Sequence, residues 1–177
     1  MLKYLIQNTT IIDGTGRQGY LGSIGIEGDR IAFVSHDPFP QMDAEQVIDG
    51  TGLVTCPGFI DIHSHADLAL PDDPAGEDFL LQGITTYLGG HCGLGKAPAV
   101  GSFMKEYKAG SSGSYYTDKA DTSTFNGWLS TCAPNGTGPN YGAMVGCDPI
   151  RGSVLGVNYT RAATEEEIQQ MKGLLDE

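Results

Sequence analysis

Apolar and polar residues alternate along much of residues 1 to 56, a pattern that predicts half-buried β-strands. Residues 2 to 12 alternate loosely and end in an Asp-Gly-Thr-Gly turn. Residues 47 to 55 predict a further strand, which a second Asp-Gly-Thr-Gly interrupts. Between them, period-two apolar residues on both sides of a Gly28-Asp29 turn predict a β-hairpin. The apolar residues of this hairpin are Ile24, Ile26, Ile31 and Phe33. We expect residues 1 to 56 to form part of a small β-sandwich.

After Pro57 the apolar residues gather in short runs instead. Phe59 to Ser64 is bounded by Pro-Gly before it and polar residues after it, which favours a buried strand. Ile84 to Leu88 predicts a second buried strand, and Glu77 to Gln82 predicts a helix between the two. Tyr141 to Gly146 predicts a third strand.

Residues 96 to 140 are rich in Gly, Ser, Thr and Asn and predict a long excursion between the second and third strands. A helix within it is expected to begin near Ser123 or Thr124 and to carry Phe125, Trp128 and Leu129. The clearest helix of the chain begins at Thr164, which forms a capping box with Glu167. Its apolar face consists of Ile168, Met171, Leu174 and Leu175. The chain stops inside this helix, which we interpret as an interruption.

The order strand, helix, strand, excursion, strand, helix is typical of parallel βα units. We therefore expect an α/β protein in which the sandwich portion, residues 1–56, precedes a partial barrel, residues 57–177. This partial barrel would comprise the first three βα units of an incomplete TIM-like barrel. Three strands cannot close an eight-stranded barrel, which needs about 250 residues.

Composition and charge exclude several classes of function. The chain has 177 residues and a formal net charge of −12, so it repels phosphate backbones and we expect no nucleic-acid partner. No apolar run approaches the roughly 18 residues of a membrane span. The apolar start of the chain is also too short for the core of a signal peptide. We therefore expect a cytoplasmic protein without a membrane partner, in which the four cysteines do not form a disulfide framework.

Asp61-Ile62-His63-Ser64-His65 is the most specific motif in the chain. Side chains at i and i+2 of a strand point to the same side, so His63 and His65 are expected to face one way, about 6–7 Å apart. Two such imidazoles can converge on one cation, and barrel active sites lie at the carboxyl ends of strands. Asp61 lies on the same face and could orient a ligand imidazole. The alternative, two surface histidines without a metal, is disfavoured by the strand context.

Cys92 ends the second predicted strand, and the glycines around it leave room for its thiol to reach inward. A thiolate is a strong zinc ligand, whereas a buried cysteine without that role is a small apolar filler. The histidine pair on the preceding strand favours the ligand role. His63, His65 and Cys92 are therefore the candidate metal ligands.

These motifs carry a family resemblance. The run from Pro57 to His65 resembles the first-strand signature of the amidohydrolase superfamily. Residues 82–86, followed by 90–93, resemble the second-strand signature of its N-acyl-D-amino-acid deacylase branch, in which Asn usually stands at the position of His91.

The resemblance continues toward the end of the chain. Residues 144–151 and 154–156 resemble the third-strand region of the same branch, where a His commonly stands at the position of Cys147. The helix from Glu165 to Glu177 resembles the one that follows. The resemblance thus covers nearly the whole chain, with a poor match over 96–140.

The resemblance implies zinc-dependent hydrolysis of the amide bond of N-acyl-D-amino acids. His63 and His65 would serve one metal position, and Cys92 would serve one tightly bound zinc and bridge to a second, weak site. Two histidines from later strands complete the zinc site in this branch, and an aspartate from the last strand is the general base and acid. These positions lie beyond residue 177, so we expect no catalytic residue in this chain. The expected partners are a small-molecule N-acyl amino acid and a second chain that supplies the rest of the barrel.

Two other interpretations stay open. The chain could be an inactive truncated fragment that serves as a metal-binding or interaction module. It could also belong to a cyclic amide hydrolase of the hydantoinase type, but Cys92 disfavours this, because those enzymes typically bridge their metals with a modified lysine.

Several other side chains are set aside. His36 is expected in a solvated loop, and strand alternation predicts that His91 points away from Cys92. Asp67 is expected either to support a ligand or to cap a loop, and Arg151 could bind a carboxylate. The remaining cysteines, expected to be structural, are Cys56, Cys132 and Cys147.

Overall fold

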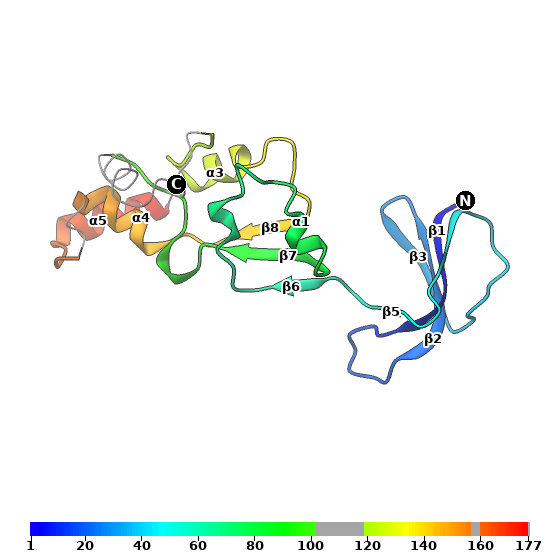
Figure 1. Ribbon diagram of the computed structural model, residues 1–177. Helices are drawn as coiled ribbons and strands as arrows, with labels where there is room; N and C mark the ends of the chain where they lie inside the picture. The colour runs from blue at the N-terminus through cyan, green and yellow to red at the C-terminus, as the bar shows by residue number, and fades with distance from the viewer. Residues whose placement is uncertain (102–118, 157–159, 177) are drawn as a thin grey trace. The chain divides into compact units, whose positions relative to one another are not determined.

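The computed structural model describes residues 1–101, 119–156 and 160–176 (Figure 1). The chain divides into two compact units, Met1–Pro57 and Gly58–Glu177. Both units contain β-sheet, and the helices lie in the second, which confirms the expected mixed α/β composition.

Met1–Pro57 forms one five-stranded sheet in the order β3-β2-β1-β4, with β5 also pairing with β1. The pairs β1–β2 and β2–β3 are antiparallel, whereas β4 and β5 run parallel to β1. The strands are β1 (Leu2–Ile11), β2 (Tyr20–Glu27), β3 (Arg30–Ser35), β4 (Ala44–Asp49) and β5 (Val54–Thr55). The predicted hairpin is confirmed as β2–β3, and the strand predicted over residues 47 to 55 is split in two at its Asp-Gly-Thr-Gly.

The two Asp-Gly-Thr-Gly segments of this unit form the same turn. Asp13 Oδ1 accepts hydrogen bonds from the backbone N–H and the hydroxyl of Thr15, at 3.0 and 2.7 Å. Asp49 Oδ1 accepts the same pair from Thr51, at 2.9 and 2.5 Å. These bonds from the following threonine lower the pKa of both carboxyl groups. The repeated sequence is therefore repeated turn chemistry.

The core of this unit is built from side chains of β1 and β2. Its buried apolar side chains are Leu2, Leu5, Ile11 and Ile24. Thr9 is fully buried among them, and its hydroxyl is 3.2 Å from the carbonyl of Leu53 and 2.8 Å from the hydroxyl of Thr55. This polar link ties β1 to the segment that contains β5.

Gly58–Glu177 is built on a parallel sheet in the order β6-β7-β8. Figure 1 shows the three strands side by side, with α4 and α5 beyond their carboxyl ends. The strands are β6 (Phe59–Asp61), β7 (Ile84–Gly89) and β8 (Asn140–Ala143). The helices are η1 (Ala66–Leu68), α1 (Glu77–Leu80), η2 (His91–Gly93), α3 (Phe125–Thr131), α4 (Cys147–Leu155) and α5 (Glu165–Leu175). Of the predicted excursion, residues 102–118 lie outside the described residues.

Two of the predicted helix starts are confirmed. The hydroxyl of Thr124 accepts a hydrogen bond from the backbone of Gly127 at the start of α3. Thr164 and Glu167 form both bonds of the capping box at the start of α5. Helix α4 was not predicted, because its residues, which include Pro149 and Gly152, lack a clear apolar period.

The prediction of a buried first strand was wrong. β6 covers only Phe59–Asp61, and Phe59, Ile60 and Ile62 are 58%, 66% and 72% exposed. The physical reason is that β6 is an edge strand with β7 as its one hydrogen-bonded neighbour among the described residues. The apolar run that indicated a buried strand is therefore an exposed apolar edge of this sheet.

The core of this unit lies beside β7. Tyr87 is buried there and stacks on Phe79, with ring centroids 4.8 Å apart. Trp128 of α3 is also buried and donates from its indole N–H to the hydroxyl of Tyr141, at 3.2 Å. The buried members of this cluster are Leu70, Tyr87, Ala97, Trp128 and Cys132. They fix the sheet and its following turns, which carry the candidate site.

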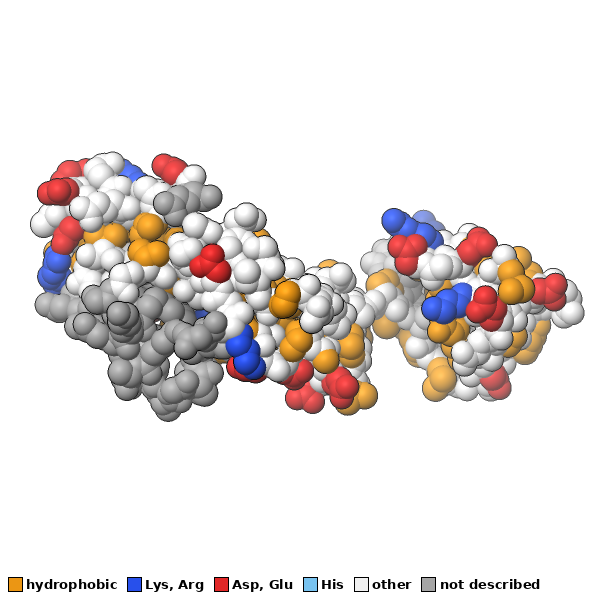
Figure 2. Space-filling model, turned by 90° about the horizontal axis from the view of Figure 1, so that it is seen from above, with side chains coloured by type: hydrophobic (Ala, Val, Ile, Leu, Met, Phe, Trp, Pro, Cys, Tyr) orange, Lys and Arg blue, Asp and Glu red, His pale blue; other side chains and the backbone are white. Residues whose placement is uncertain are grey.

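The surface is mixed in character. Figure 2 shows acidic side chains spread over the visible face of each unit, with apolar side chains among them. In the described part of the chain, no helix is long and apolar enough to cross a membrane.

Candidate metal centre

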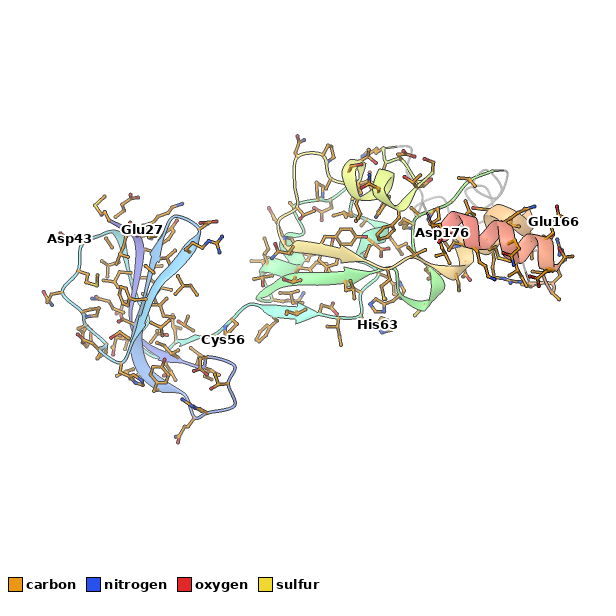
Figure 3. All side chains as sticks on the ribbon, turned by 180° about the vertical axis from the view of Figure 1, so that it is seen from behind. Glu27, Asp43, Cys56, His63, Glu166 and Asp176 are labelled. Atoms are coloured by element: carbon orange, nitrogen blue, oxygen red, sulfur yellow. The ribbon has the colours of Figure 1, made fainter. Side chains whose placement is uncertain are left out.

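His63 and His65 follow the last residue of β6, Asp61, in the chain, and Figure 3 labels His63 beyond the carboxyl end of that strand. The backbone N–H of Ser64, between them, donates to the carbonyl of Leu88 at 3.2 Å, so this segment stays attached to β7 after the strand has ended. The imidazole centroids are 5.9 Å apart, with ring planes at 66°. His63 is exposed and His65 is half-buried.

Cys92 reaches the same place from the turn after β7. It lies in η2 with φ 56° and ψ 24°, a left-handed conformation that is rare for a residue other than glycine. Gly90 before it and Gly93 after it also have positive φ. The chain therefore turns sharply at the end of β7 instead of continuing as a strand, and the exposed thiol of Cys92 lies beside His63.

The three predicted ligands converge. One nitrogen from each of His63 and His65 and the sulfur of Cys92 all lie within 4.8 Å of one another. Cys92 Sγ and His63 Nε2 are 3.4 Å apart. Among the described residues, this is the group of His, Cys, Asp and Glu side chains whose spacing suits a metal ion.

This donor set fits zinc. Two imidazole nitrogens and one thiolate are zinc ligands of the kind found in tetrahedral sites. Zn–N and Zn–S bonds of about 2.0 and 2.3 Å at a tetrahedral angle place two such ligands about 3.5 Å apart, close to the Cys92–His63 separation. His65 Nδ1 is buried without a hydrogen-bond partner in the described structure. This nitrogen is therefore available to bind a metal or to form a hydrogen bond with a neighbouring group.

Strand alternation predicted that His91 points away from Cys92, yet His91 approaches the site through His63. Its ring stacks on the ring of His63, with centroids 4.2 Å apart and planes at 18°. The strand alternation behind the prediction does not apply, because Gly90 and Cys92 place His91 in a turn. The glycines of the Gly-Gly-His-Cys-Gly segment were the sequence signal that could have shown this.

Asp61 is half-buried at the end of β6, and its Oδ1 accepts a hydrogen bond from the backbone N–H of His63, at 3.0 Å. It thus fixes the backbone that carries the histidine pair.

Asp67 is the more deeply buried carboxylate of the site, at 1% exposure. Its Oδ2 accepts a hydrogen bond from the backbone N–H of Gly90, at 3.2 Å. Burial raises the pKa of Asp67, against the opposing influence of the nearby Lys96 ammonium and of the Gly90 bond. Lys96 is itself buried, which lowers its pKa to about 8. No pattern in the sequence indicated that this lysine would lie inside the protein.

The other cysteines differ from one another. Cys132 is buried, as a structural cysteine should be, whereas Cys56 and Cys147 are exposed. The sulfur of Cys147, at the start of α4, lies 2.9 Å from the place that a Cβ on Gly93 would occupy. Cys147 therefore lies against the turn that carries Cys92. Arg151 donates to the carbonyl of Arg161 at 2.8 Å, and His36 is exposed in the first unit.

Comparisons with known proteins agree with the family resemblance. No protein-family model matches the chain. D-aminoacylase and N-acyl-D-aspartate deacylase, both from Alcaligenes xylosoxydans xylosoxydans, are 32% and 33% identical to it, and both alignments cover 98% of this chain and 34% of the relative. The chain thus spans about a third of the length of the curated relatives that it matches.

Solved structures give the same result. A D-aminoacylase with a binuclear metal centre matches with a TM-score of 0.83 and 32% identity, over 99% of this chain and 36% of that protein. N-acyl-D-glutamate deacylase from Bordetella bronchiseptica, complexed with zinc and a phosphonate inhibitor, matches with a TM-score of 0.77 and 27% identity, over 98% of this chain and 35% of that protein.

Proposed function

We propose that this chain forms the metal-binding part of an N-acyl-D-amino-acid deacylase. Nearly its whole length is homologous to the N-terminal part of D-aminoacylases, which are amidohydrolases. The observation that carries the proposal is the convergence of His63, His65 and Cys92 at the carboxyl ends of β6 and β7. The names of two relatives, N-acyl-D-aspartate deacylase and N-acyl-D-glutamate deacylase, support the substrate class.

In this proposal the two units are the first part of a β-sandwich and the first three βα units of a barrel. The exposed apolar edge at Phe59, Ile60 and Ile62 supports this, because further barrel strands would cover it. The later zinc ligands and the general base would come from polypeptide outside these 177 residues, in this chain's own continuation or in a second chain. The share of the relatives that the chain spans, about a third, supports this division.

The ligand residues have distinct tasks in the proposed enzyme. A zinc bound here supplies Lewis acidity for amide hydrolysis, since it lowers the pKa of water and polarises a carbonyl. Asp61 holds the backbone of His63, and the Gly90–Gly93 turn brings the Cys92 thiol to the histidine pair. We assign His63 and His65 to one metal position and Cys92 to a tightly bound zinc, whose other ligands would come from polypeptide outside these 177 residues, with the Cys92 thiolate able to serve both positions.

Cobalt substitution tests the metal half of the proposal. Co²⁺ bound by a thiolate gives a charge-transfer absorption band that histidine and carboxylate ligands do not give. We expect this band on titration of the 177-residue chain with Co²⁺, and we expect zinc to displace it. Cys92→Ser should abolish the band, because it replaces the proposed sulfur ligand with a hydroxyl of similar size.

Two exposed cysteines provide matched controls. Cys56→Ser changes a thiol in the first unit, and Cys147→Ser changes one that lies against the Cys92 turn. Both variants should keep the band. A band that survives in Cys92→Ser, or disappears in Cys147→Ser, would contradict the assignment of the sulfur ligand.

The substrate half requires the zinc-loaded protein together with any polypeptide that completes it. We expect hydrolysis of N-acyl-D-amino acids, little hydrolysis of their L enantiomers, and loss of activity in His63→Ala and Cys92→Ser. Release of the free amino acid, measured for each enantiomer, checks this. Equal rates on both enantiomers would reject a D-amino-acid deacylase.

A further inference from the structure

Asp67 touches both segments that carry the metal ligands. It lies two residues after His65, in η1, and its Oδ2 accepts the backbone N–H of Gly90, two residues before Cys92. A Cβ on Gly89 would lie 2.7 Å from Asp67 Cβ, so the end of β7 can pack this closely on the aspartate only because Gly89 has no side chain. One carboxylate therefore lies between the histidine segment and the cysteine turn.

Three buried side-chain polar atoms have no hydrogen-bond partner in the described structure: Asp67 Oδ1, His65 Nδ1 and His91 Nε2. The first two belong to residues that are two apart in the chain. One is an acceptor, and the other becomes a donor when the imidazole carries its proton on Nδ1.

A histidine that binds a metal through one nitrogen usually donates the N–H of its other nitrogen to a carboxylate or carbonyl, which fixes the ring and its tautomer. An unpartnered imidazole nitrogen and an unpartnered carboxylate oxygen, two residues apart and both shielded from water, are the complementary halves of that arrangement. Asp61, the carboxylate expected in this role, bonds instead to the backbone of His63.

From this geometry we infer that Asp67 is a positioning residue for the metal site. Its Oδ1 accepts the Nδ1–H of His65 in the metal-loaded protein, so that His65 binds through Nε2, while its Oδ2 holds the Cys92 turn through Gly90. This inference rests on the proposed function. To the proposed function it adds a residue, Asp67, that joins the two segments carrying the ligands. It also names Nε2 as the nitrogen through which His65 binds.

The alternative role for Asp67 is purely structural, as an acceptor for Gly90 and a counter-charge for the buried Lys96. Two substitutions separate these roles. In Asp67→Asn the amide oxygen can still accept from Gly90, but the amide NH₂ then faces His65 and favours the tautomer with Nε2 protonated, which cannot bind the metal through Nε2. In Lys96→Met the buried positive charge near Asp67 is removed, so the double variant shows the effect of Asp67→Asn without that charge.

The experiment measures zinc affinity by competition with a chromophoric chelator, together with the thermal unfolding midpoint of the metal-free protein, on the 177-residue chain. We expect Asp67→Asn to weaken zinc binding by roughly 10- to 100-fold, the usual consequence of losing such a partner. The double variant Asp67→Asn/Lys96→Met should stay equally weak. Thr124→Ala, which removes the cap of α3 in the same unit, should lower the unfolding midpoint without changing zinc affinity.

A spectroscopic readout addresses the hydrogen bond itself. Long-range ¹H–¹⁵N NMR of the zinc-loaded chain should show His65 with its proton on Nδ1, and this signal should be lost in Asp67→Asn.

Wild-type affinity in Asp67→Asn, affinity restored by Lys96→Met, or a His65 proton on Nε2 would each overturn the inference. Absence of zinc binding in the unsubstituted chain would instead overturn the proposed function, and this inference with it.

Discussion

The two units place their important side chains differently. In Met1–Pro57 the buried residues lie within strands, as Leu5 and Thr9 do in β1. In Gly58–Glu177 the candidate ligands lie on turns just after strands, and Cys92 adopts a left-handed backbone conformation to reach its position. The first arrangement rests on strand pairing, with an irregularity in β1 around Asn8, whereas the second depends on several special backbone positions and on a buried carboxylate. Substitutions at those positions should therefore have much larger effects than comparable ones in the first unit.

A pair of glycines provides the largest expected contrast. Gly90 has φ 81°, and a Cβ there would lie 2.1 Å from the carbonyl oxygen of Met144. Gly28, in the β2–β3 turn, has φ 59° and open space around it. We expect Gly90→Ala to destabilise its unit by roughly 3 kcal/mol or more, because backbone strain and steric overlap add. Gly28→Ala should cost about 1 kcal/mol, through strain alone.

Denaturant unfolding of both variants checks this contrast. Fluorescence of Trp128, the single tryptophan, reports on the second unit. Equal losses of stability in the two variants would show that the turn after β7 is no more constrained than an ordinary hairpin turn.

Zinc should act on one unit and leave the other unchanged. At a free zinc concentration 100 times its Kd, binding adds about 2.7 kcal/mol of stability to the state that binds it. Hydrogen exchange followed by mass spectrometry should show slower exchange in peptides that contain His63, His65 and Cys92. No change is expected in peptides from Met1–Pro57, which contains none of the three ligands. Protection spread evenly over both units would argue against a localised site.

A buried hydroxyl tests whether the first unit also depends on polar links. Thr9→Val keeps the shape of the side chain but removes its hydrogen bonds with the carbonyl of Leu53 and the hydroxyl of Thr55, and we expect a loss of about 1–2 kcal/mol. Thr10→Val, one residue along the same strand, removes a hydroxyl that makes no hydrogen bond within the described residues and should change little. Denaturant unfolding compares the two. A Thr9→Val variant with unchanged stability would show that the first unit does not depend on this polar link.

The smallest effect concerns pH and the last helix. The side chain of Arg161, with the backbone of Thr164, lowers the pKa of Glu167 from 4.5 to about 2. Since this carboxyl has a lower pKa when folded, its contribution to stability is complete above about pH 4.5 and is lost as the pH falls toward about 2. NMR titration should find this low pKa, and Arg161→Gln should move it back toward 4.5. A pKa unchanged by the substitution would contradict the pairing.

The sequence was a good guide wherever local rules decide the structure. The β2–β3 hairpin, the caps at Thr124 and Thr164 and the strand β7 follow from turn residues, capping chemistry and alternation. The three candidate ligands were also predicted, because the His-x-His spacing and the glycines around Cys92 are readable without a structure.

Other features depend on tertiary packing that no local pattern records. An apolar run such as Phe59–Ser64 indicates burial only if another element covers it, and among the described residues none does. The stacking of His91 on His63 follows from the backbone at Gly90 and Cys92, and the burial of Lys96 follows from where its loop packs. These side chains lie around the candidate site. The surroundings of the three candidate ligands were therefore less predictable from the sequence than their convergence.

X-ray absorption spectroscopy at the zinc edge, on the chain loaded with one equivalent of zinc, tests the central claim most directly. If His63, His65 and Cys92 bind the metal, the spectrum will show one sulfur neighbour at about 2.3 Å and imidazole nitrogens at about 2.0 Å, and the sulfur will disappear in Cys92→Ser while remaining in Cys147→Ser. A shell of oxygen and nitrogen alone, or a sulfur that persists in Cys92→Ser, would contradict the account.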